Sequence, residues 1–213
     1  MRWLLGLLLL LSLGGCNRVI TTAPLFGHQS GDPTLKDGVW LVENKLDLML
    51  TTDREAPCVV DDRGPASGWP DCATWFVVEG GQVRTPEGAS RRRPDWDRLG
   101  LVVSDGDPPI LQLGNVDERG VAEYNYFGLR PVSSDPDGRL LAADIWTVQC
   151  GPPPPQCQGQ PTRYLTWDLL PGLTGEGDNC TTASAQALRA AAAASRAWAG
   201  DPGRIRWARE RFD

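Results

Sequence analysis

The sequence predicts a mainly β fold: an antiparallel sheet, sandwich or small barrel with one C-terminal α-helix packed on it. From residue 38 onward, short runs of β-branched and aromatic residues recur between Gly, Pro and Asp residues, as strands separated by turns do. One late segment, about 182–199, is instead rich in alanine and has no β-branched residue after Thr182. Many short strands followed by one helix are typical of a sheet that a helix covers.

The first 15 residues have the pattern of an export signal. Arg2 supplies a positive charge, and residues 3–13 form a leucine-rich apolar run. A membrane-spanning helix needs about 20 apolar residues, so this run is too short to remain as an anchor. We therefore expect a signal peptide at residues 1–15 that is removed after export.

The signal ends in Leu-Gly-Gly-Cys at residues 13–16, which resembles the lipobox of bacterial lipoproteins. The resemblance implies cleavage before Cys16, a diacylglyceryl group on its thiol and an acyl chain such as palmitate on its new amino group. One acyl chain anchors only marginally, whereas two or more anchor stably, so the membrane is the expected partner. In the enterobacterial lipoproteins that this motif resembles, Asp after the cysteine retains the protein in the inner membrane. Asn17 therefore favours the periplasmic face of the outer membrane.

The mature chain is expected to form one domain behind a tether. Removing 15 of the 213 residues leaves 198, a length that suits one domain burying roughly 70% of its unfolded surface. Residues 16–37 begin with the lipidated cysteine and are otherwise polar and rich in Pro, Gly and Thr, which predicts a flexible tether. Residues 38–213 are then the mainly β domain. The net charge of −6 argues against a nucleic-acid partner.

Within that domain the individual elements follow from local patterns. Strands are predicted at 38–43, 73–79, 99–104 and 163–169, and a hairpin runs from 123 to 149. Pro136 fixes φ in the hairpin turn, and Gly138 accepts the left-handed conformation that closes it. In the helix at about 182–199, Thr181 or Thr182 is the expected N-cap, and Gly200 followed by Asp-Pro ends it.

Five cysteines remain after lipidation, and an exported, oxidising compartment favours disulfides over a metal site. Cys58 and Cys72 close a loop of 15 residues, which is worth about 3 kcal/mol in the entropic account. Cys150 ends a strand and Cys180 precedes the helix, so they form the second predicted pair, leaving Cys157 free. Four prolines between Cys150 and Cys157 favour an extended chain and disfavour a local bridge. A Cys157–Cys180 bridge stays open as the alternative.

No catalytic constellation is recognisable. The only histidine, His28, lies in the predicted tether, so a Ser-His-Asp or Cys-His constellation would need the tether to fold back over the domain. The GxSxG, HExxH, GxxxxGK[ST] and GxGxxG motifs are missing, and no cofactor is expected. Asp135 and Asp137 fit turn chemistry better than a calcium site.

Neighbouring carboxylates are the remaining route to catalysis. Glycosidases need two carboxylates and use aromatic platforms for sugar. The candidates lie beside Gly, Pro or other turn residues, which favours a turn role for them; they are Asp61 with Asp62, Asp95 with Asp97, and Asp105 with Asp107.

Eight tryptophans survive cleavage, and their positions separate core candidates from binding candidates. Trp40, Trp75, Trp146 and Trp167 fall in predicted strands, where core packing is expected. The candidate exposed platforms for a glycan or a protein partner have polar or proline neighbours; they are Trp69, Trp96 and Trp207. Four arginines surround the last of these within residues 204–211. This basic cluster either docks on the domain's own carboxylates or faces an acidic envelope partner.

Two wider resemblances bear on function. The Gly-Val-Trp triplet at 38–40, opening the first strand of the domain, resembles the lipocalin pattern and implies an eight-stranded barrel holding a lipid-like ligand, although the other lipocalin signatures are missing. The segments WPDCA at 69–73, CGPPPP at 150–155 and NCT at 179–181 resemble proteobacterial envelope lipoproteins without an assigned activity. We expect a non-catalytic envelope lipoprotein with a binding or structural role. The alternatives are an envelope glycan hydrolase with a carboxylate pair, or a lipocalin-like carrier of an apolar ligand.

Overall fold

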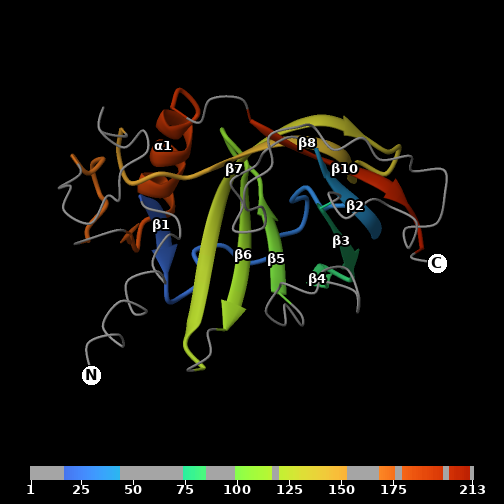
Figure 1. The fold of residues 1–213 in the computed structure, drawn as a ribbon, viewed down its shortest axis with the longest axis horizontal. Helices are drawn as coiled ribbons and strands as arrows, with labels where there is room; N and C mark the ends of the chain where they lie inside the picture. The colour runs from blue at the N-terminus through green and yellow to red at the C-terminus, as the bar shows by residue number, and fades with distance from the viewer. Residues whose placement is uncertain are drawn as a thin grey trace, which may run out of the picture.

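Eight antiparallel strands close into a barrel, and α1 (Ala185–Ser195) packs on its outside (Figure 1). The computed structural model describes residues 17–43, 74–84, 99–116, 120–152, 168–175, 179–198 and 202–211. The predicted fold class is confirmed, and a barrel is the form that it takes. Among the described residues, no helix combines the length and the apolar character needed to cross a membrane.

The barrel is a meander that the C-terminal strand completes. In chain order its strands are β2 (Gly38–Glu43), β3 (Thr74–Glu79), β4 (Gln82–Arg84), β5 (Leu99–Ser104), β6 (Ile110–Val116), β7 (Ala122–Ser134), β8 (Leu140–Thr147) and β10 (Gly203–Arg209). Each strand up to β8 pairs with the next. After α1, β10 returns to lie between β8 and β2, where Ile205 is opposite both Ala143 and Val42.

Alternating side chains fill the barrel interior. In β2 and β3, Trp40, Phe76 and Val78 belong to the interior cluster, while their neighbours Val39 and Trp75 belong to a separate cluster on the outer face. The rings of Trp40 and Phe76 stack with centroids 6.3 Å apart. Every barrel strand contributes to this interior core, whose buried members are Leu35, Trp40, Val78, Val83, Leu101, Val103, Leu111, Phe127, Leu129, Leu140, Ala143, Ile145 and Ile205.

The β7–β8 hairpin confirms the predicted turn. Gly138 has φ +80°, and its amide donates to the carbonyl of Asp135 at 3.0 Å. The Asp135 carboxylate accepts hydrogen bonds from the amides of Asp137 at 3.0 Å and Arg139 at 2.9 Å. Both aspartates also pair with the Arg139 guanidinium. The prediction that these aspartates serve the turn is therefore confirmed.

Helix α1 is shorter than the predicted span of about 182–199. Its N-cap is Ser184, whose hydroxyl accepts from the amide of Ala187 at 3.1 Å, so the predicted cap at Thr181 or Thr182 is wrong. The Thr182 hydroxyl instead donates to the carbonyl of Gly172 at 2.9 Å and accepts from the Ser184 amide. Thr182 therefore fixes the chain just before the helix, and Ser184 caps the helix.

Alanines let α1 lie close to the barrel. Ala191 and Ala192 are fully buried, together with Leu188. The Ala192 carbonyl accepts a hydrogen bond from the indole Nε1 of Trp146 at 2.8 Å, so this tryptophan projects from the outer face of β8 to the helix. Trp198 is only partly buried.

The N-terminal segment is part of the fold. β1 (Arg18–Thr21) pairs antiparallel with the first half of β7 and parallel with β9 (Asn179–Cys180). In Figure 1, β1 and α1 lie on the same side of the barrel. Val19 and Leu35 are buried at 1% and 5% exposure.

The prediction of a flexible tether at 16–37 is wrong for residues 17–37. A few apolar side chains in this largely polar stretch pack against the barrel. The average composition of the stretch does not show that these side chains are buried. They join a second core between α1, β1 and the outer face of the barrel, formed by Val19, Ile110, Tyr126, Val148, Cys150, Leu173, Cys180, Leu188, Ala191 and Ala192 with Leu25 and Phe26 at its edge.

Candidate functional site

The residue after the predicted lipidation site is buried and hydrogen-bonded to the chain that follows β8. Asn17 is 3% exposed, and its side-chain amide donates to the carbonyl of Gly151 at 2.8 Å. Its side-chain oxygen accepts from the amide of Cys150 at 3.0 Å. The backbone has φ +73°, a left-handed conformation that Asn tolerates better than most residues. We refer to Asn17, Arg18, Cys150, Gly151 and Cys180 as the N-terminal junction.

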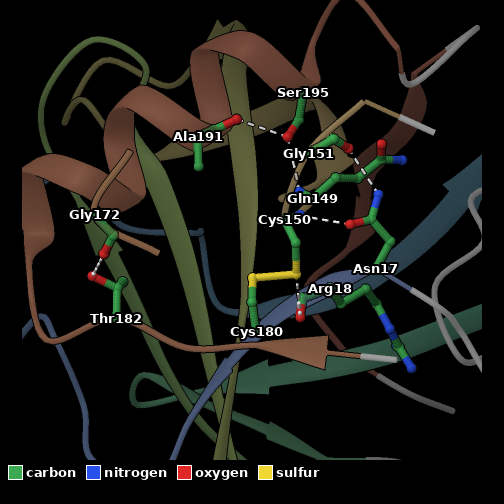
Figure 2. The surroundings of a disulfide bond; sticks show 10 residues. All are labelled: Asn17, Arg18, Gln149, Cys150, Gly151, Gly172, Cys180, Thr182, Ala191 and Ser195. Atoms are coloured by element: carbon green, nitrogen blue, oxygen red, sulfur yellow. Dashed lines mark hydrogen bonds between the residues drawn. A yellow bond between two sulfur atoms is a disulfide. The ribbon is translucent and has the colours of Figure 1, made fainter. Parts of the chain in front are cut away.

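A disulfide joins Cys150 to Cys180 within this junction, with Cα atoms 5.8 Å apart (Figure 2). The second predicted pair is therefore confirmed. Because Cys180 belongs to β9 and β9 pairs with β1, the bond ties the chain after β8 to the N-terminal strand. The other predicted pair, Cys58–Cys72, and the predicted free Cys157 lie outside the described residues.

The C-terminal end of α1 is fixed to the same place. The hydroxyl of Ser195 donates to the carbonyl of Ala191 at 2.7 Å and accepts from the amide of Gln149 at 2.8 Å (Figure 2). Gln149 also forms a β-bridge with Arg18. Four elements that are distant in sequence therefore meet at the junction: β1, β9, the end of α1 and the chain leaving β8.

A second cluster of polar residues lies on the outer face of β7, β8 and β10. Asp144 is 2% exposed and lies between Arg130 and Arg204, which are directly opposite it on the two neighbouring strands. Arg130 Nε donates to Oδ2 at 3.1 Å, and Arg204 Nε donates to Oδ1 at 2.9 Å. Burial acts to raise the pKa of Asp144, but the hydrogen bonds and charges of the two arginines outweigh it and hold the pKa below its usual range. Asp144 is therefore ionised at neutral pH, and its carboxylate pairs with both arginines.

Two of the four arginines in the basic C-terminal stretch dock on the domain's own carboxylates. Arg204 pairs with Asp144, and Arg206 pairs with Glu43 across the β10–β2 junction. The cluster is expected either to dock on the domain's own carboxylates or to face an acidic partner. These two arginines dock on the domain.

Trp207 is held in the structure and does not form an open platform. Its indole Nε1 donates to the carbonyl of Asp37 at 2.9 Å, and the Lys36 ammonium lies 4.1 Å from the ring centroid. The partly buried ring also packs against the interior core. The other candidate platforms, Trp69 and Trp96, lie outside the described residues.

The catalytic candidates are only partly within the described chain. The pairs Asp61–Asp62 and Asp95–Asp97 lie outside it. Asp105 has a turn role, because its carboxylate accepts from the Gly106 amide at 2.8 Å. Over the described ranges, no group of three or more His, Cys, Asp and Glu residues is placed to hold a metal ion.

Arg189 has a role that the sequence did not indicate. From α1, its Nη2 donates to the Ser104 hydroxyl at 2.7 Å and to the Asp105 carbonyl at 2.6 Å. Its guanidinium carbon lies 4.8 Å from the ring centroid of Phe26. A Cβ at Gly106 would come within 2.9 Å of the guanidinium, so glycine leaves room for it. Arg189 therefore joins α1 to the β5–β6 turn and to the N-terminal segment.

No protein-family model matches the sequence, and no curated protein or solved structure is significantly similar to it. Function must therefore be inferred from the residues and their arrangement alone.

Proposed function

We propose that the protein is a lipid-anchored component of a bacterial envelope, with a mature chain that begins at Cys16 and a barrel with a binding or structural role. The observation that carries the proposal is the Leu-Gly-Gly-Cys sequence at 13–16 directly after a short apolar export signal. The Cys150–Cys180 disulfide supports it, because such bonds persist in exported, oxidising compartments. The membrane is the partner, and Asn17 favours the periplasmic face of the outer membrane.

A lipocalin-like carrier is the second candidate, and the barrel topology favours it. Eight antiparallel strands close around one interior, and the Gly-Val-Trp triplet at 38–40 opens β2. Against it, the interior side chains of all eight strands form one continuous core, with Trp40 at 0% exposure. A ligand inside the barrel would have to displace these packed side chains, which favours a binding surface on the outside.

The glycan hydrolase has less support than either. A general acid needs a raised pKa, whereas the pKa of the buried Asp144 is lowered by two arginines. The Asp105 carboxylate is engaged by its own turn. We therefore place the hydrolase third.

The test is metabolic labelling with an alkyne analogue of palmitate, in a Gram-negative host that expresses the full chain. We expect label on the wild type, recovered with the membranes, and none on Cys16→Ala. Cys157→Ala removes a thiol that is predicted to be free and should keep the label, so it is the matched control. A wild-type chain that is soluble and unlabelled would rule out the lipid anchor.

A further inference from the structure

Almost no chain separates the proposed lipid from the barrel. Asn17 is the residue next to Cys16, and its buried side chain is bonded to Gly151 and Cys150. Consecutive Cα atoms are about 3.8 Å apart, whereas a flexible linker of about 20 residues spans about 25 Å on average. A lipid on Cys16 would therefore start one peptide unit away from a fixed point on the domain.

That fixed point is also rigidly connected to the rest of the fold. β1 begins at Arg18, immediately after Asn17, and pairs with β7 and β9. The disulfide holds β9 to Cys150, and Ser195 holds the end of α1 to Gln149. The domain could not swing freely about such an anchor, and its orientation to the bilayer would be restricted.

One exposed apolar side chain, Leu169, lies beside the junction. The amide of Leu170 donates to the carbonyl of Cys150 at 2.8 Å, and a Cβ on Gly151 would come within 2.3 Å of the Asp168 carbonyl. This close approach places Leu169 next to the junction, where it is 36% exposed. Held next to a lipid on the adjacent cysteine, this leucine would be close enough to contact the interfacial region of the bilayer.

Two basic side chains lie at or beside the junction. Arg18 belongs to the junction, and Arg196 follows Ser195 at the end of α1, while Asp168 is the acidic residue beside Gly151. Arg196 also lies over the Trp146 ring, with its guanidinium carbon 5.3 Å from the ring centroid. Basic residues at a membrane surface are attracted to anionic headgroups.

We propose that the flank of the barrel formed by α1, β1 and the segment around Leu169 lies directly against the bilayer surface, with no spacer between lipid and domain. The proposal rests on lipidation of Cys16, the function proposed above. In this arrangement the lipid bilayer contacts this flank. The opposite wall of the barrel, around β4, faces the periplasm or a partner there.

The experiment compares two labelled positions on opposite sides of the barrel. Leu169→Cys marks the proposed membrane flank. Gln82→Cys marks exposed β4, which is four strands from β8 in either direction around the ring. Both are made in a Cys157→Ala background, labelled with a fluorophore, purified as lipidated protein and reconstituted in vesicles that carry a quencher at headgroup depth.

We expect loss of most of the emission at position 169 and little loss at position 82. Inserting about 20 Gly and Ser residues between Cys16 and Asn17 should remove most of the difference, because the domain then moves on a flexible linker. Intact mass is measured on the same samples. A lipidated chain with equal quenching at both positions would overturn this inference alone, whereas a chain without lipid would overturn the proposed anchor and the inference with it.

Discussion

The side-chain amide of Asn17 donates a hydrogen bond to the carbonyl of Gly151 at 2.8 Å, across 134 residues of sequence. The side-chain oxygen of the same residue accepts from the amide of Cys150. The position that follows the proposed lipidated cysteine therefore has two roles. It is a candidate sorting residue, and its hydrogen bonds hold the N-terminal segment against the barrel.

Asn17→Ala is expected to lower the free energy of unfolding by about 2–3 kcal/mol, because two buried hydrogen bonds are lost and alanine is strained at positive φ. Asn17→Gly is the matched control. Glycine avoids the strain but does not restore the two hydrogen bonds, so the free energy of unfolding should fall by less than in Asn17→Ala. Urea unfolding of residues 16–213 with Cys16→Ser, followed by tryptophan fluorescence, measures both. Two variants as stable as the parent would mean that residue 17 is not docked.

The disulfide is expected to contribute about 3–4 kcal/mol, because it closes a long loop in the unfolded chain; its cysteines are 30 residues apart. The double variant Cys150→Ala/Cys180→Ala should lose that amount in urea unfolding. Cys157→Ala should lose little, since its thiol is predicted to be free. A loss from Cys157→Ala as large as that of the double variant would instead favour the Cys157–Cys180 pairing.

Asp144 should make stability depend on pH in the acid range. Because its pKa is lowered in the folded state, its stabilising effect is present above the unfolded pKa of about 3.9 and is lost as the pH falls through the folded value. Asp144→Asn should lower stability by about 2 kcal/mol at pH 7, and the difference from wild type should shrink below about pH 4. The control is Asp137→Asn, whose side chain is 73% exposed and whose effect should be small. A difference that does not depend on pH would contradict the ionised state of Asp144.

Gly128 should be essential for packing on the outer face of the barrel. A Cβ there would lie 2.3 Å from the Trp146 ring, which lies over this glycine and hydrogen-bonds to α1. Gly128→Ala is expected to destabilise the protein by about 1–3 kcal/mol through overpacking. The matched substitution Gly100→Ala adds a Cβ with no atom within 4 Å and should be close to neutral. Equal effects of the two substitutions in urea unfolding would show that contact with Trp146 is not the cause.

Local sequence patterns predicted the parts of the fold that depend on local chemistry. The Asp-Pro-Asp-Gly turn at 135–138 specifies its hairpin through φ preferences and aspartate hydrogen bonds, and the structure confirms it. The alanine-rich helix and the Cys150–Cys180 pair were also predicted and are confirmed. Each of these depends on a strong local preference or on a small number of possible partners.

The parts that were missed depend on partners far away in sequence. Nothing in the composition of residues 17–37 shows that Val19 would pair with β9 or that Asn17 would bond to Gly151. The four arginines at 204–211 predict only a basic cluster, although their alternation with Ile205 and Trp207 is also the pattern of a strand with one buried face, which the structure shows as β10. The alternation does not specify that β10 pairs with both β8 and β2, because that pairing depends on strands that are distant in sequence.

The most direct test of the lipid anchor is the intact mass of the protein purified from membranes of its host, with and without reduction and thiol labelling. We expect the mass of residues 16–213 plus a diacylglyceryl and an acyl group, with one labelled thiol and two disulfides. A chain that is unlipidated, or that still carries residues 1–15, would contradict it.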